Sequence, residues 1–199
     1  MEAMLARRTV ILSDEINHSS IAELRHNLLQ LQTYSNDSIT LIIDSGGGCL
    51  EASLSLCDFM ATVMTAPIRG VAMGRCGSAA TFIMLHCDER VGTLYSRFLV
   101  HSGTRSKITV PINNTTDQHF KQLQRELNAT EKMVLQLYIE KLTPKTWTKE
   151  ISNDDRKKFV RDVTARGDQR FDEWLSVQEA IDIGLIESVV TGKLGIFPN

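Results

Sequence analysis

Short apolar runs alternate with amphipathic segments through the first half of the chain. In the first amphipathic segment, Ile21, Leu24 and Leu28 recur at helical spacing. The apolar runs between such segments have strand length, and strand–helix alternation predicts an α/β core with a mainly parallel sheet and right-handed crossovers. The predicted strands are 8–12, 38–44, 67–74, 90–94 and 97–101, and the predicted helices are 19–34, 50–65 and 78–87.

The second half of the chain has a different pattern. Residues 102–116 are polar and predict a loop or a short extended arm, whereas 117–142 predict one long helix with wide apolar faces. Such a helix packs either against another subunit or on its own sheet, and the pattern leaves both open. Residues 143–163 are charged and predict a helix towards their end.

The last patterned segment, 175–190, carries explicit helix-end signals. Ser176 and Glu179 form an S-x-x-E capping box, and Gly184 stands where a C-terminal cap belongs. Residues 185–190 then predict a final strand.

Composition narrows the class of protein. The 199 residues fit one domain, or one domain with an appendage, and 42% hydrophobic residues suffice for a sizeable core. The net charge of -2 does not favour nucleic acid or an anionic membrane as a partner. The chain has no apolar run approaching the roughly 18 residues of a membrane span, and its start does not resemble an export signal.

The cysteines are Cys49, Cys57, Cys76 and Cys87, and no two of them form a C-x-x-C pair. This spacing argues against a zinc site, so we expect no metal and no cofactor. We expect reduced thiols in a cytoplasmic compartment.

Three predicted loops leave the C-terminal ends of strands, where the sites of parallel sheets gather. They are 45–48, 74–78 and 101–104, and they hold a glycine run, Ser78 and His101. A serine nucleophile needs a base and oxyanion donors, and His101 is the one histidine of five whose predicted position suits a base. Cys76 is a rival nucleophile, although a small residue packed at a strand end explains it better. These residues suggest a Ser–His pair and leave the acid open.

Four motifs in order resemble the Clp protease proteolytic subunit family, the serine peptidases of the ClpP/crotonase fold. The family's N-S-P-G-G after a strand matches "DSGGG", and its G-x-A-A-S-M-G matches "GRCGSAA", which contains Ser78. A strand ending in the catalytic histidine matches "RFLVH", and "FDEWLSVQEAIDIGLIES" matches the last motif with Asp172 at the aspartate position. The match covers about 8–190.

The resemblance implies a fold of repeated β-β-α units with a protruding handle helix. One peptidase domain, 1–199, would comprise a head (about 1–104 and 165–199) and a handle region (about 105–164). It implies a serine endopeptidase that cleaves unfolded polypeptides or short peptides in an oligomeric chamber. Ser78 would be the nucleophile, His101 the base and Asp172 the orienting acid, with Asp168 as the fallback.

By position in the motifs, the amides of Gly47 and Ala79 would form the oxyanion hole. The resemblance also implies heptameric rings of this chain, stacked as a tetradecamer, and a possible AAA+ Clp ATPase partner. Because the chain begins almost at the first predicted strand, we expect the family's N-terminal gating segment to be nearly absent.

The chain departs from the family pattern near the site. Gly46 replaces the proline of the first motif, Asp44 its asparagine, and Gly77 and Ala79 flank the serine differently. Two alternatives therefore stay open beside an active peptidase: a catalytically silent subunit that assembles with an active paralogue, and an acyl-CoA enzyme of the crotonase branch.

Overall fold

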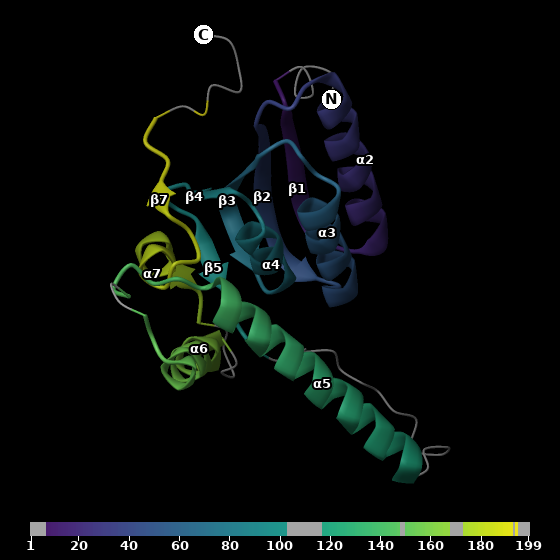
Figure 1. Ribbon diagram of the computed structural model, residues 1–199, viewed down its shortest axis with the longest axis vertical. Helices are drawn as coiled ribbons and strands as arrows, with labels where there is room; N and C mark the ends of the chain where they lie inside the picture. The colour runs from purple at the N-terminus through teal and green to yellow at the C-terminus, as the bar shows by residue number, and fades with distance from the viewer. Residues whose placement is uncertain (1–6, 103–116, 148–149, 168–172, 193, 195–199) are drawn as a thin grey trace. The chain divides into compact units, whose positions relative to one another are not determined.

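The computed structural model describes residues 7–102, 117–147, 150–167, 173–192 and 194 (Figure 1). These residues form two compact units. The first unit takes its described residues from 1–100, 142–149 and 174–199, and the second unit from 101–141 and 150–173. The predicted grouping into one head and one handle of a single domain stays a prediction.

The first unit is built on a seven-stranded sheet in the order β1-β2-β3-β4-β7, with β5 and β6 off this path. All pairs are parallel except β5 with β6, so the mainly parallel α/β sheet predicted from the sequence is confirmed. The strands are β1 (Thr9–Ile16), β2 (Ile39–Gly48), β3 (Ile68–Gly77), β4 (Glu89–Gly92), β5 (Arg97–Leu99), β6 (Leu175–Ser176) and β7 (Ser188–Val189).

Helices connect the first four strands. Each crossover steps to the next strand in the same direction across the sheet, so right-handed crossovers place these helices on one face (Figure 1). Their buried residues, such as Leu24, Leu28 and Leu56, form the core against β1, β2 and β3. The connecting helices are α2 (His18–Tyr34), α3 (Leu50–Thr62) and α4 (Ala79–Leu85), and α7 (Val177–Asp182) follows β6.

Three strands run further than the hydrophobic pattern predicts, and the first of them, β1, continues from Leu12 to Ile16. β2 continues through the glycine run to Gly48, because its end pairs with β1, Ile16 opposite Gly48. β3 continues to Gly77, because its end pairs with β5 after its first half has paired with β4. The segments 45–48 and 74–77, predicted as loops, are therefore extended backbone held in the sheet. This extension fixes the backbone that leads into Ser78.

The second unit contains the helices α5 (Asp117–Lys141) and α6 (Asn153–Gly167), which contact each other. The long helix predicted over 117–142 is thus confirmed to within one residue. Along α5, Val134 and Tyr138 are buried, whereas Leu127 and Met133 are exposed. In the part of α5 whose side chains are described, burial is confined to the C-terminal half.

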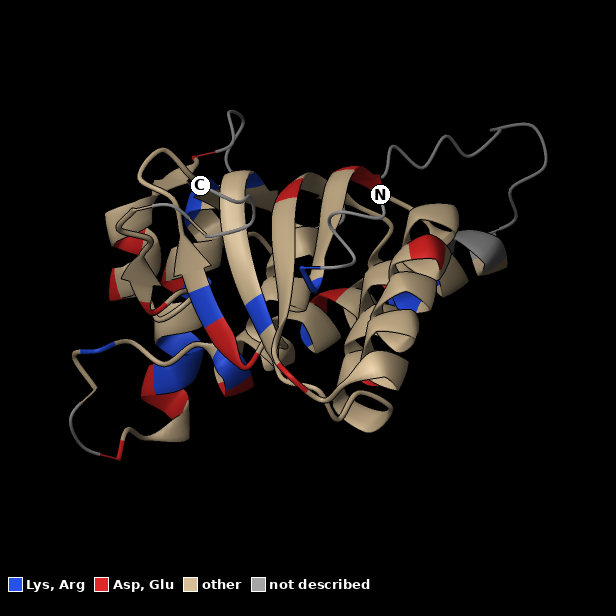
Figure 2. Cartoon of the chain, turned by 90° about the horizontal axis from the view of Figure 1, so that it is seen from above, with Lys and Arg blue, Asp and Glu red and all other residues tan. Residues whose placement is uncertain are grey.

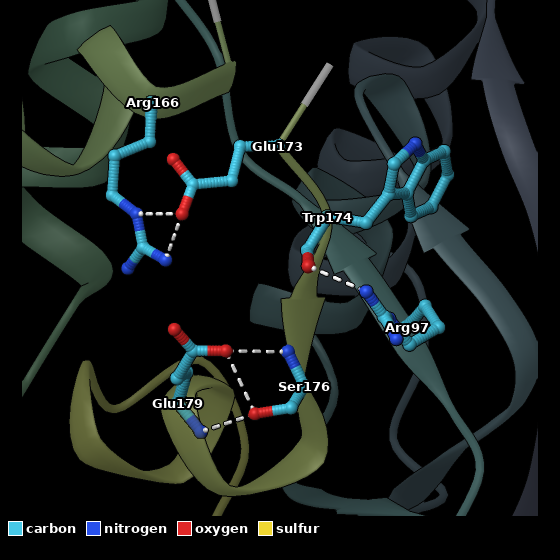
Figure 3. A network of polar contacts seen from close by, with 6 residues as sticks. All are labelled: Arg97, Arg166, Glu173, Trp174, Ser176 and Glu179. Atoms are coloured by element: carbon cyan, nitrogen blue, oxygen red, sulfur yellow. Dashed lines mark hydrogen bonds and ion pairs between the residues drawn. The ribbon is translucent and has the colours of Figure 1, made fainter. Parts of the chain in front are cut away.

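The predicted ends of α7 are confirmed. The Ser176 hydroxyl oxygen accepts from the Glu179 N–H at 3.3 Å, and the Glu179 carboxylate accepts from the Ser176 N–H at 2.8 Å (Figure 3). Gly184 follows the helix with a φ of 76°, and a Cβ there would lie 2.3 Å from the Thr143 carbonyl, so glycine is required.

Ser176→Ala removes the side-chain acceptor of this cap. We expect the free energy of unfolding to fall by about 1 kcal/mol, measured by urea denaturation. Ser55→Ala, at an exposed position within α3, is the matched control and should change it by less than about 0.5 kcal/mol. Equal stability of the Ser176→Ala variant and the wild type would contradict the cap.

Candidate active site

Ser78 lies at the corner between β3 and α4 with a backbone conformation unusual for a residue that carries a side chain. Its φ is 52° and its ψ is −125°. A non-glycine residue in such a region costs about 1–3 kcal/mol and persists only where surrounding contacts enforce it. The Ser78 N–H donates to the Leu99 carbonyl at 2.8 Å, and its carbonyl accepts from the N–H and hydroxyl of Thr81 at 2.9 and 2.6 Å. The strand β5 and the first turn of α4 therefore hold this corner.

The glycine run approaches the Ser78 corner at backbone distance. A Cβ built on Gly47 would lie 2.6 Å from the Ser78 Cβ, 2.7 Å from the Gly77 carbonyl oxygen and 3.0 Å from the Ala79 nitrogen. Any side chain at 47 would therefore collide with the corner. The structure thus brings together three of the five residues named from the sequence, namely Ser78, Gly47 and Ala79.

The amide groups of these neighbours differ in their partners. Ala79 begins α4, so its N–H has no acceptor within the helix. The Gly47 N–H instead donates to the Ser45 hydroxyl oxygen at 3.1 Å, and that hydroxyl donates to the Asp14 carbonyl. Because Ser45 is fully buried, this bond is shielded from water. Use of the Gly47 amide as an oxyanion donor would require this hydrogen bond to be broken or shared.

Asp44 is a site residue whose role the sequence did not predict. Its carboxylate accepts from the Arg75 N–H at 2.9 Å, and a Cβ on Gly74 would lie 2.6 Å from the carboxylate oxygen. The side chain that stands in place of the family's asparagine thus joins the end of β2 to the segment before Ser78. An acidic residue at the end of the predicted strand 38–44 was the available signal.

Trp174 is a second neighbour that sequence reasoning missed. A Cβ on Gly77 would lie 2.7 Å from the indole of Trp174, so the indole packs directly on the backbone before Ser78. The Trp174 carbonyl accepts from the Arg97 guanidinium at 3.0 Å (Figure 3). Leu175 pairs with Phe98 in the adjoining strands. A short antiparallel pair gives no hydrophobic pattern, which is why this contact was not predicted.

Two other groups near Ser78 are unsuited to catalysis. Cys76 is fully buried, and burial raises the pKa of its thiol far above the ordinary value, which keeps it protonated. The His86 Nδ1 lies 2.8 Å from the Phe82 carbonyl oxygen, so the imidazole is engaged with the backbone of its own helix. These observations leave Ser78 as the nucleophile candidate at this corner.

The remaining candidate residues are the predicted base and the two predicted acids. His101 is half-buried and is the first residue of the second unit. Asp172 and its fallback Asp168 lie outside the described residues. Arg166 and Glu173, which flank these two aspartates in the sequence, form an ion pair in the second unit (Figure 3). The triad of Ser78, His101 and Asp172 stays a prediction.

Charge does not single out a macromolecular partner. Acidic and basic residues occur together within the same elements, including β4 and α6 (Figure 2). Among the described helices, none combines the length and the apolar character needed to cross a membrane.

Comparison with known proteins yields one family. The model of the Clp protease family matches residues 1–193. ATP-dependent Clp protease proteolytic subunit 2 of Treponema denticola is 28% identical over 98% of this chain and 88% of its own length. Subunit 1 of Protochlamydia amoebophila is 23% identical over 94% and 82%, and subunit 2 of Treponema pallidum is 25% identical over 95% and 85%. The fold and these matches agree with the motifs around Ser78: the chain belongs to the Clp protease family.

Proposed function

We propose that this protein is a serine endopeptidase that hydrolyses peptide bonds with Ser78 as nucleophile, His101 as base and Asp172 as orienting acid. The observation that carries the proposal is the strained Ser78 corner with the Gly47 backbone against it. Strain of this kind concentrates at functional sites, where it presents a side chain that a relaxed turn would not.

The chain itself supports His101 as the base. The Leu99 carbonyl accepts the Ser78 N–H, and His101 follows Leu99 by two residues. Among the five histidines, His101 is the nearest in sequence to this hydrogen bond.

Position in the family motif supports Asp172 over Asp168. Asp172 stands four residues before Ser176, at the aspartate position of the last motif, whereas Asp168 lacks this downstream match.

In the proposed mechanism, the Ser78 hydroxyl attacks the carbonyl carbon of the scissile bond while His101 takes its proton. His101 then gives that proton to the leaving amine, and Asp172 stabilises the imidazolium that forms between these steps. Water, activated by His101, releases the acyl group from Ser78. The whole cycle needs donors for the oxyanion of each tetrahedral intermediate.

The Ala79 amide at the start of α4 is the first proposed donor, because it has no acceptor within its helix. The Gly47 amide is the second, and it becomes available when its hydrogen bond to the Ser45 hydroxyl opens. In this proposal the described conformation is a resting arrangement, and substrate binding supplies the energy to redirect the Gly47 peptide.

The relatives are named proteolytic subunits of an ATP-dependent protease, and this supports unfolded polypeptides or short peptides as substrates. By the same similarity, we propose a cytoplasmic homo-oligomer, in heptameric rings stacked as a tetradecamer, with an ATPase of the AAA+ Clp class as partner. The exposed Leu127 and Met133 on α5 fit a role of this helix in subunit contacts.

A second candidate, a catalytically silent subunit that assembles with an active paralogue, is favoured by one observation. The buried Ser45 hydroxyl occupies the Gly47 amide, and a permanently occupied donor would leave the oxyanion hole incomplete. Reactivity of Ser78 distinguishes the two candidates.

The purified wild-type protein should react with a fluorophosphonate probe at Ser78 and cleave fluorogenic peptides. Ser78→Ala should abolish the labelling and lower hydrolysis at least about a thousandfold, because the nucleophile is lost. The native mass and the melting temperature of the variant should match those of the wild type. Equal hydrolysis by both proteins would exclude this mechanism, and an intact wild type without labelling would favour the silent subunit.

A pair of substitutions distinguishes which of the two aspartates is the orienting acid. Asp172→Asn should lower kcat by about 10³–10⁴-fold, because asparagine can orient the imidazole in the wrong tautomer and cannot stabilise its charged form. Asp168→Asn, the matched control, should keep kcat near the wild-type value. The reverse pattern in peptide hydrolysis would assign the acid to Asp168.

Adjacent glycines provide a test of the backbone contact. Gly47→Ala places a methyl group on the Ser78 corner at a φ of 108° and should reduce stability by about 2–4 kcal/mol and remove activity. Gly46→Ala is the control, because a Cβ there meets nothing closer than the Arg75 guanidinium at 3.7 Å. Thermal unfolding and probe labelling measure both effects. Similar behaviour of the two variants would show that the close approach at Gly47 is unimportant.

A further inference from the structure

We propose that His18, Cys49 and Glu51 form a binding site for a zinc ion, independent of the peptidase activity. The imidazole, thiol and carboxylate each offer one ligand atom, and these atoms lie within 4.8 Å of one another. The Cys49 sulfur is 3.8 Å from the His18 Nε2. All three residues belong to the first unit, and none has a role in the proposed mechanism.

The spacing of these atoms suits tetrahedral zinc. With Zn–S near 2.3 Å and Zn–N near 2.0–2.1 Å, a sulfur and a nitrogen on one zinc ion lie about 3.6 Å apart. The observed 3.8 Å between Cys49 and His18 is within reach of this value by side-chain rotation alone. Three protein ligands leave a fourth position for water, as in many zinc sites.

Pairing of β1 with β2 brings His18 and Cys49 together. β1 and β2 pair in parallel up to Ile16 opposite Gly48, and the Cys49 N–H still donates to the Ile16 carbonyl at 2.8 Å. His18 is the first residue of α2, two residues after Ile16, and Cys49 is the N-cap of α3, directly after Gly48. A Cβ on Gly48 would lie 2.3 Å from the Ile16 carbonyl oxygen, so this close approach requires glycine. The rigid sheet edge therefore presets the distance between the two ligands.

The chemistry of the set favours zinc over harder cations. A thiolate together with an imidazole binds zinc in preference to magnesium and calcium, which favour oxygen ligands. Zinc binding needs a deprotonated thiol, and the amino end of α3, where Cys49 and Glu51 lie, stabilises negative charge. The thiolate and the carboxylate would together neutralise the charge of a divalent zinc ion.

The ligands are also accessible. His18 and Glu51 are exposed and Cys49 is half-buried, whereas Cys57, Cys76 and Cys87 are buried. Cys49 is thus the cysteine open to a metal ion from solution. The spacing of the cysteines alone does not reveal this site, because the partner of Cys49 is a histidine 31 residues earlier in the sequence.

The test uses the full-length protein without a histidine tag, freed of metal, and titrated with Co²⁺ and with Zn²⁺. We expect one equivalent of Co²⁺ to bind with a thiolate-to-cobalt charge-transfer band that Zn²⁺ removes. Cys49→Ser should abolish the band. His18→Gln and Glu51→Gln should weaken Zn²⁺ binding more than about tenfold in calorimetry, since loss of even an outer partner has that effect.

His26→Gln and Glu23→Gln are the matched controls, because both residues are exposed on α2 and lie outside the cluster. They should bind Zn²⁺ as the wild type does, and Zn²⁺ should raise the melting temperature of the wild type and the controls only. Absence of saturable binding, a cobalt band that survives Cys49→Ser, or equal losses in the controls would each overturn the proposal. Melting temperatures measured without metal show that the variants are folded.

Discussion

Close approach of backbone to backbone at the ends of three parallel strands is the constraint on which this structure depends. Gly48 lies against the Ile16 backbone on one side, and Gly47 lies against the Ser78 corner on the other. Both contacts would be closed to any residue with a Cβ. The end of β2 is therefore a narrow spacer between β1 and β3, and it sets where the groups that follow each strand emerge. The candidate active site and the candidate zinc site both use positions that this spacer defines.

The strain at Ser78 has its counterpart in contacts that come from distant parts of the chain. β5 accepts the Ser78 N–H through Leu99, and β6 brings Trp174 onto the Gly77 backbone. The energy that a positive φ costs is thus offset by pairing and packing formed only in the completed fold. Both contacts lie within the first unit.

Buried parallel strands and amphipathic helices were predictable because their periodicities are local properties of the sequence. The strand ends were not, because hydrogen bonds to β1 and β5 extend the glycine run and the segment before Ser78, and glycine carries no such signal. For the site, Ser78 and its small neighbours were readable from motif spacing. The roles of Asp44 and Trp174 were not, since each depends on a partner from another strand. The bond between Ser45 and the Gly47 amide and the clustering of His18 with Cys49 were hidden for the same reason.

The three glycines of 46–48 differ in whether packing requires the absence of a side chain. Three successive glycines cost conformational entropy on folding, and collisions at Gly47 and Gly48 explain two of them. Gly46 has no such reason, since a Cβ there would have room, and the family motif has proline at this place. The N–H of Gly47 is part of the peptide bond between residues 46 and 47. Its direction is set by rotation about ψ of Gly46 and φ of Gly47, and proline at 46 would restrict its neighbours where glycine does not. In the proposed function, the Gly47 amide turns from the Ser45 hydroxyl towards the substrate, and glycine at 46 adds no side chain that would oppose this rotation.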